Sequence, residues 1–185
     1  MKISFIIKHS KKKKKLIDEL IYKCQSQDEF NDPIICYTKR PKHAIDLARN
    51  HAKKGINIII AIGGDGTLNE VLNGIMKVPN HNITLGHYPL GTANDFSKSM
   101  GITNNLEQFL ETLKNNNTKL IDVGKIIYHH HETMKDHYFL NIADAGLGGY
   151  VAHKLNKSKK LLGGKFAYFK VIFTGIISFK KPHVK

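Results

Sequence analysis

The sequence predicts an α/β fold in which a mostly parallel sheet is flanked by helices. Three observations predict it. Short β-branched runs alternate along the chain with segments of helical spacing, as in repeated strand–helix units. The run INIIIAI at Ile56–Ile62 is nearly continuous, which is typical of a parallel strand buried on both faces. Glycine-rich segments follow two of the expected strands directly, as ligand-binding turns do in such folds.

The first elements follow in order along the chain. Lys2–Ile7 is a short β-type run, and 11–25 places apolar residues on one helix face. A second strand is expected over Ile34–Thr38. Helical spacing returns at Ala44–Ala52, and Gly55 ends that helix.

The strand Ile56–Ile62 leads into a helix that we expect from Thr67 to about Met76. A fourth strand is expected over Thr84–Tyr88, and a further helix from about Asn105 to Lys114. Residues 1–117 therefore form a nucleotide-binding α/β domain in this interpretation.

The pattern changes near Asn115. Two strand-like runs, Leu120–Tyr128 and His137–Ile142, are joined by HHHETMKD and predict an antiparallel hairpin. Residues 118–185 are therefore expected to be an incomplete β-rich second domain, because so few strands do not make a stable sheet. The chain is either a fragment, or partner strands come from elsewhere, for example from a homo-oligomer. A glycine-rich patch, a Lys-rich helix and a helix over Lys165–Phe179 follow.

Composition limits the possible partners and compartments. The formal net charge is +14, which indicates a polyanionic partner such as nucleotide phosphates, nucleic acid or an anionic membrane surface, or else a generally Lys-rich proteome. Two scattered cysteines and the absence of a signal-type N-terminus predict a cytoplasmic protein, which touches a membrane at most from one side. We expect no metal cluster at His129, His130, His131 and His137, which lie at the expected hairpin tip.

The segment GGDGT at residues 63–67 has the composition of a phosphate-binding turn. Gly63, Gly64 and Gly66 let backbone N–H groups approach an anion, and the following helix directs its positive end to the same point. Asp65 places a carboxylate where ligands bind, to orient a nucleotide hydroxyl or to act through a cation. Thr67 is expected to be the N-cap, with Glu70 in capping-box position. The alternative is a plain βα turn.

A second segment, PLGTANDF at residues 89–96, follows the next expected strand. Gly91 allows a tight turn, while Thr92, Asn94 and Asp95 offer caps and ligand contacts at another helix start. Alone it is only a capped turn.

Together, GGDGTLNEV and PLGTANDF resemble the diacylglycerol kinase catalytic-domain family, and in particular its bacterial lipid kinases. GGDGT itself is similar to a signature that NAD kinases and phosphofructokinases share. The resemblance implies a diacylglycerol kinase-like fold and an ATP- and Mg²⁺-dependent lipid kinase. Its partner would be a lipid at an anionic membrane surface, with no nucleic acid.

Carried over by position, the resemblance implies site residues in both segments. Asp65 and Asp95 are the candidate catalytic residues. The implied nucleotide-binding residues are Thr38, Gly63, Gly64, Asp65, Gly66, Thr67, Leu68, Asn69, Glu70, Gly91, Thr92 and Asn94.

The chain departs from the family pattern at two places. Lys8-His9-Ser10 stands where many members have Asn-Pro-x-x-Gly, although the lysines at 11–15 can substitute electrostatically. The family's downstream Asp-Gly-Glu, which supplies the proposed general base and magnesium ligands, is absent from these 185 residues. Three hypotheses therefore stand: a lipid kinase, a kinase for a soluble acceptor such as NAD, and a catalytically inactive nucleotide- or membrane-binding fragment. For the chain as given we expect nucleotide binding with little or no turnover.

Overall fold

The structure is a computed structural model that describes residues 2–27, 29–30, 32–79, 82–144, 146–157 and 172–175. Its contacts divide the chain into two compact units, Met1–Asn141 and Ile142–Lys185. Each unit is described separately below.

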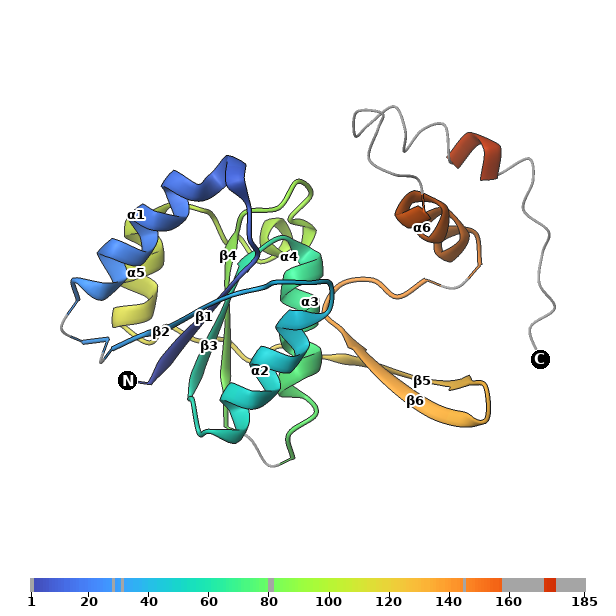
Figure 1. Cartoon of the computed structure of the whole chain (residues 1–185), viewed down its shortest axis with the longest axis horizontal. Coiled ribbons are helices and arrows are strands. Elements are labelled where there is room, and N and C mark those ends of the chain that lie inside the picture. The colour runs from blue at the N-terminus through green and yellow to red at the C-terminus, as the bar shows by residue number, and fades with distance from the viewer. Residues whose placement is uncertain are drawn as a thin grey trace. The chain divides into compact units, whose positions relative to one another are not determined.

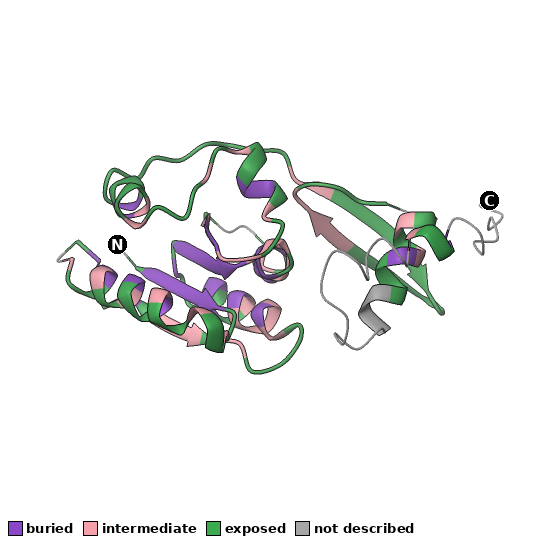
Figure 2. Ribbon diagram, turned by 90° about the horizontal axis from the view of Figure 1, so that it is seen from above, coloured by how far each residue is buried: buried purple, intermediate pink, exposed green. Residues whose placement is uncertain are grey.

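A four-stranded parallel sheet forms the centre of the first unit, as the sequence predicts (Figure 1). Its strands are β1 (Ile3–Ile7), β2 (Ile34–Tyr37), β3 (Ile58–Gly63) and β4 (Thr84–Pro89), in the order β2-β1-β3-β4. All three neighbouring pairs run parallel. Every residue of β1 and of β3 is buried, which explains why their sequences are apolar on both faces (Figure 2).

Two helices cover one face of this sheet. They are α1 (Lys14–Gln25), which follows the short 3₁₀ turn η1 (Lys11–Lys13), and α5 (Leu106–Lys114). Their apolar stripes pack on alternate residues of the strands, including Phe5, Ile60 and Tyr88, which are fully buried. The helical spacing in the sequence is thus explained by one buried face per helix.

The other face is covered by α2 (His43–Lys53) and α3 (Asp65–Ile75), which pack on Ile6, Ile59 and Ala61. These two helices approach each other closely at Gly74. A β-carbon added to Gly74 would overlap the Ile45 carbonyl oxygen and lie 2.6 Å from Cβ of Ala48. The helix that starts at the glycine-rich turn is therefore fixed against its neighbour by backbone contact.

The strand order changes direction between β1 and β3. From β1 the chain crosses to β2 on one side, and it then crosses back to β3 on the other. The turns after β1 and β3 consequently separate at the carboxyl edge of the sheet, which is where ligands bind in open α/β folds.

The predicted hairpin is confirmed, but its boundaries were wrong. Its strands are β5 (Gly124–His130) and β6 (Thr133–Phe139), so most of the segment expected as a loop is paired strand. Residues 120–123 and 140–142, expected in the strands, are not. Only His131 and Glu132 form the turn, and His131 adopts φ +54°. A tight two-residue turn of this kind lengthens both strands beyond their apolar residues.

Asn73 of α3 fastens the hairpin to the helix. This side chain is only 3% exposed. Its Nδ2 donates to the Tyr138 carbonyl at 2.9 Å, and its Oδ1 accepts from the Tyr138 N–H at 2.9 Å. The amide therefore pairs with the free edge of β6 as a neighbouring strand would.

The hairpin belongs to the first unit, Met1–Asn141. The domain boundary expected after residue 117 stays a prediction, as does a partner chain completing the second domain.

The second unit contains α6 (Leu147–Lys157), which begins within the glycine-rich patch and not after it, since it includes Gly148 and Gly149. Of the helix expected over 165–179, the structure describes residues 172–175, and these are helical. The rest of that expected helix lies outside the described residues. Within the described part of the chain, no helix is both long and apolar enough to cross a membrane.

Two glycines of α3 give a matched stability test of the close packing between α2 and α3. We expect Gly74→Ala to lower the free energy of unfolding by about 1–3 kcal/mol, because its methyl group has no space between α2 and α3. Gly66→Ala, in the same helix with nothing within 4 Å, should be neutral or stabilising by up to about 1 kcal/mol. Urea denaturation of both variants measures this, and equal effects would contradict the packing.

Candidate functional site

The two glycine-rich turns that the sequence singled out lie against each other at the carboxyl edge of the sheet. A β-carbon on Gly91 would lie 2.5 Å from Cα of Gly64, and one on Gly64 would lie 2.9 Å from Cα of Gly91. No larger residue fits at either position without separating the turns. Gly64 of GGDGT and Gly91 of PLGTANDF are therefore required by one shared close contact.

Hydrogen bonds join the same two turns on both sides of this contact. The Gly63 carbonyl accepts from the Leu90 N–H at 2.6 Å, and Oδ1 of Asp65 accepts from the Phe96 N–H at 3.1 Å. Asn94, at φ +52°, closes the second turn, because its Oδ1 accepts from the Gly91 N–H at 2.8 Å. The first function of the Asp65 carboxylate is thus to cap α4 (Asp95–Ser99).

The start of α3 differs from the expected one. Gly64 is the N-cap, with extended backbone angles, so the helix begins at Asp65 and Thr67 lies inside its first turn. Thr67 is buried, and its Oγ1 packs at Gly63. The expected capping box does not form, because Glu70 lies too far along the helix. The Glu70 carboxylate instead accepts from the N–H groups of Lys42 (3.1 Å) and Ala44 (3.3 Å), and so caps α2.

The backbone at the start of α3 is left able to bind an anion. Among the residues that the structure describes, the N–H groups of Gly64, Asp65 and Gly66 donate to no other group of the protein. They lie at the positive end of an eleven-residue helix. Gly66 is exposed, so its N–H is open to solvent. Backbone donors in this position are the kind of group that binds anions at helix N-termini.

The remaining expected site residues occupy different positions around this turn. Thr38 directly follows β2, where its N–H donates to the Ile7 carbonyl at 2.8 Å, two strands away from Gly63. Leu68 is buried in the core, so only its main chain can face a ligand. Asn69 contacts Nε2 of His137 at 3.1 Å. Thr92 and Asp95 are exposed on the second turn, and Asp95 pairs with Lys98 at 3.6 Å.

Lys13 brings a positive charge to the two turns. It lies in η1, after β1, and its Nζ donates to the Leu90 carbonyl at 2.6 Å. The sequence indicated lysines 11–15 as a group that could replace the missing Asn-Pro-x-x-Gly turn. The structure distinguishes Lys13 within that group, since its ammonium contacts the second glycine-rich turn.

The surrounding edge is also rich in cations. The loops after β1 and β2 carry exposed lysines at positions 8, 11, 12, 39 and 42. Arg40 is engaged by Asp46 at 2.6 Å. An anionic ligand at this edge is therefore favoured by the field around it.

Two buried polar residues of the site were missed from the sequence. His87 of β4 contacts the Gly63 carbonyl through Nε2 at 3.2 Å, and Ser97 of α4 contacts His87 Nδ1 at 2.8 Å. The available signal was weak. His87 is a polar residue in a strand that otherwise buries apolar ones, two positions before PLGTANDF.

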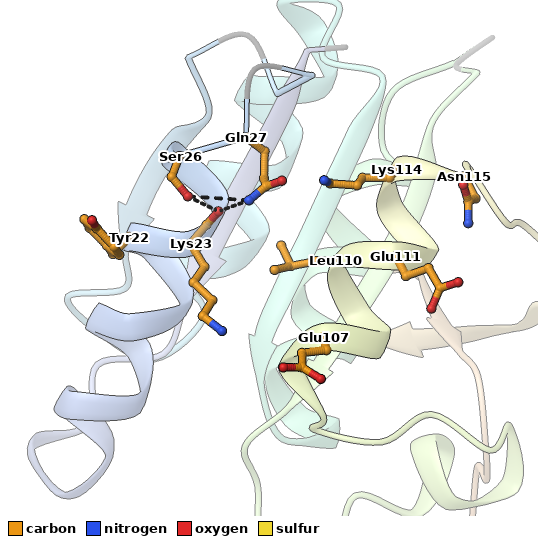
Figure 3. A pocket seen from close by; sticks show the side chains of 9 residues that line it. All are labelled: Tyr22, Lys23, Ser26, Gln27, Glu107, Leu110, Glu111, Lys114 and Asn115. Atoms are coloured by element: carbon orange, nitrogen blue, oxygen red, sulfur yellow. Dashed lines mark hydrogen bonds between the residues drawn. The ribbon is translucent and has the colours of Figure 1, made fainter.

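A separate cavity of about 510 Å³ opens between α1 and α5 (Figure 3). Its lining residues belong to the later turns of α1 and to α5, and they include none of the expected site residues. Because α1 runs back from the end of β1 to the start of β2, these later turns lie toward the opposite edge of the sheet from the glycine-rich turns. The cavity is therefore not part of the candidate site.

Comparison with known proteins agrees with this geometry. The chain is 36% identical over 132 residues to a diacylglycerol kinase of Staphylococcus haemolyticus, a match that covers 71% of this chain and 37% of the relative. It is 37% identical over 113 residues to a diacylglycerol kinase of Staphylococcus aureus, covering 61% of this chain and 33% of the relative. The chain thus matches little more than a third of these curated relatives.

A solved diacylglycerol kinase structure from Bacillus anthracis has the same fold. It superposes with a TM-score of 0.59 at 23% identity, covering 92% of this chain and 55% of that one. The model of the diacylglycerol kinase catalytic domain matches residues 5–126, which include most of β1, all of β2, β3 and β4, and both glycine-rich turns. The chain therefore belongs to the diacylglycerol kinase catalytic-domain family.

Proposed function

We propose that this protein binds ATP with its phosphates at the start of α3. The observation that carries the proposal is the group of free N–H donors at Gly64, Asp65 and Gly66, beside the Lys13 ammonium. Backbone donors at a helix start suit phosphate oxygens, and the carboxyl edge beside β1 and β3 is the expected ligand position.

We further propose that the complete activity is transfer of the γ-phosphoryl group of ATP to a lipid hydroxyl such as that of diacylglycerol. The family and the names of the relatives support this acceptor over NAD or a sugar phosphate. The exposed lysines of the same edge support binding at an anionic membrane surface. Asp65 and Asp95 remain the proposed catalytic carboxylates.

Magnesium fits this site mainly as a companion of the nucleotide. In the described part of the chain, no three His, Cys, Asp or Glu side chains gather around one point. One oxygen of Asp65 is already bonded to the Phe96 N–H. Mg²⁺ is commonly held by substrate phosphates with one or two carboxylates, and it would neutralise charge on the transferred phosphoryl group.

The protein's own contribution in this proposal is positioning. The N–H groups of Gly64–Gly66 and the Lys13 ammonium hold phosphate oxygens. The Asp65 cap keeps the second turn in place against the first. Phosphoryl transfer depends mostly on such positioning and on charge stabilisation.

Lys13 and its neighbour Lys12 provide a matched pair for testing the nucleotide site. We expect Lys13→Met to weaken ATP binding about tenfold, as for loss of a hydrogen bond from a charged donor. Lys12→Met, which removes the same charge from an exposed position, should have a smaller effect. Isothermal titration of ATP into each variant measures this. Equal losses would mean that only overall charge matters.

The acceptor is tested with a chimera in which residues 1–126 replace the matching part of the S. haemolyticus relative. We expect the chimera to transfer labelled phosphate from ATP to diacylglycerol in mixed micelles, and an Asp65→Asn chimera to lose most of that activity. The unmodified relative is the positive control. A folded chimera that binds ATP but labels only NAD would overturn the lipid assignment.

A further inference from the structure

His87 is buried and contacts the first glycine-rich turn on one side and α4, the helix after the second turn, on the other. Its side chain is on β4 and is 5% exposed, and Ser97, its partner on α4, is 1% exposed. The ring joins the Gly63 carbonyl on one side (3.2 Å) to the Ser97 hydroxyl on the other (2.8 Å). It therefore connects the end of β3 with the helix after the second turn.

The hydrogen-bond partners determine which ring nitrogen carries the proton. A carbonyl oxygen can only accept, so Nε2 of His87 must be the donor to Gly63. In the neutral ring Nδ1 is then an acceptor, and the Ser97 hydroxyl donates to it. Both ring nitrogens are satisfied without any net charge, which suits a buried position.

The bond to Gly63 fixes a peptide unit of the proposed phosphate site. The Gly63 carbonyl accepts from the Leu90 N–H as well as from His87, so both of its lone pairs are used. The Gly63–Gly64 peptide is trans and planar, so its N–H points opposite to that carbonyl. Holding the Gly63 oxygen toward β4 therefore keeps the Gly64 N–H directed away from β4 and available to an anion.

Burial favours the neutral form of the His87 ring more strongly than its surroundings favour the protonated form. Burial lowers the pKa of His87, and this outweighs the Gly63 carbonyl and the negative charge of Asp65, which both raise it. Asp65 is the charged group that acts on the ring from α3. The α4 side presents Ser97 and the ring of Phe96 at 6.5 Å. Protonation would place a donor on Nδ1, opposite the hydroxyl that donates to it in the neutral state.

We propose that neutral His87 is a positioning residue for the phosphate-binding turn, which acts through the Gly63 carbonyl to hold the Gly64 N–H group in its binding orientation. This role deepens the proposed function and rests on it, because the ligand is the phosphate of ATP. His87 itself touches no ligand. Ser97 supports it by donating to Nδ1 and so holding the ring in its orientation.

The test compares His87→Leu and His87→Gln with a control that has the same chemistry elsewhere. His51 of α2 is also buried (6% exposed), and its Nδ1 lies 2.6 Å from the Ser4 hydroxyl. Its pKa is likewise lowered, first by burial and then by Lys54. His51→Leu therefore reproduces the loss of a buried histidine on the same face of the sheet without touching Gly63.

We expect His87→Leu to weaken ATP binding about five- to tenfold at pH 7.5, as for loss of one positioning hydrogen bond. His87→Gln, which keeps a donor for Gly63, should retain near wild-type affinity. His51→Leu should destabilise the fold without changing ATP affinity. Affinities that are equal in the wild type and in folded His87→Leu would overturn the proposal.

The pH dependence separates positioning from mere packing. Since the pKa of folded His87 is lowered, the ring is neutral above about 6.5, the ordinary value for histidine, and it becomes charged only as the pH falls through its lower folded pKa. Wild-type ATP affinity should therefore fall more steeply than that of His87→Gln as the pH is lowered from about 6.5 through the folded pKa of His87. Protonation of the ATP phosphates affects the wild type and His87→Gln equally, so it does not contribute to the difference between their pH profiles. Identical pH profiles would contradict the role.

The role of His87 can also be tested without nucleotide, so that its test does not depend on ATP binding. In ¹H–¹⁵N spectra of the full chain without nucleotide, the Gly64 amide should titrate with the same midpoint as the His87 ring, and this titration should vanish in His87→Gln. If the wild type failed to bind ATP, the proposed function would be wrong, and this measurement would still decide the role of His87. A Gly64 amide resonance that does not titrate with the His87 ring would overturn the proposed role of His87.

Discussion

The site depends on one backbone contact, the approach of Gly64 to Gly91. Parallel pairing of β3 with β4 carries the ends of both strands to the same level, so that Gly63 pairs with Pro89 and the following turns meet. A side chain at either glycine would separate them. The cap of Asp65 on α4 and the His87 link to Gly63 support this same junction, and the Lys13 bond to Leu90 joins η1 to its second turn. Phosphate donors and their supports are therefore organised by a single contact.

The rest of the fold holds the sheet and α3 in place around this junction. Both faces of the sheet are covered by helices, so β1 and β3 are fully buried. α3 is held by α2 at Gly74, by the Glu70 cap on α2 and by the bond of Asn73 to β6. A helix fixed in this way keeps its N–H groups in one orientation. Preorganised donors bind phosphate without the cost of ordering a loop.

Much of this could be predicted from the sequence, because the sheet and its helices follow from local pattern. The run of β3 is apolar throughout, the helix faces are periodic, and GGDGT and PLGTANDF mark the two turns that follow strands. Other features depend on tertiary contacts that no local pattern carries. Thr67 has good N-cap chemistry, yet α3 starts earlier because Gly64 is free to be extended. Glu70 caps a helix more than 25 residues away along the chain. The tight turn at His131 and the buried His87–Ser97 pair also follow from pairing in space.

The most direct test of the central claim is a crystal structure of the chain with ATP. The account predicts phosphate oxygens at about 3 Å from the N–H groups of Gly64–Gly66, with the Lys13 ammonium beside them. ATP bound in the cavity between α1 and α5, or with its phosphates away from the start of α3, would contradict it.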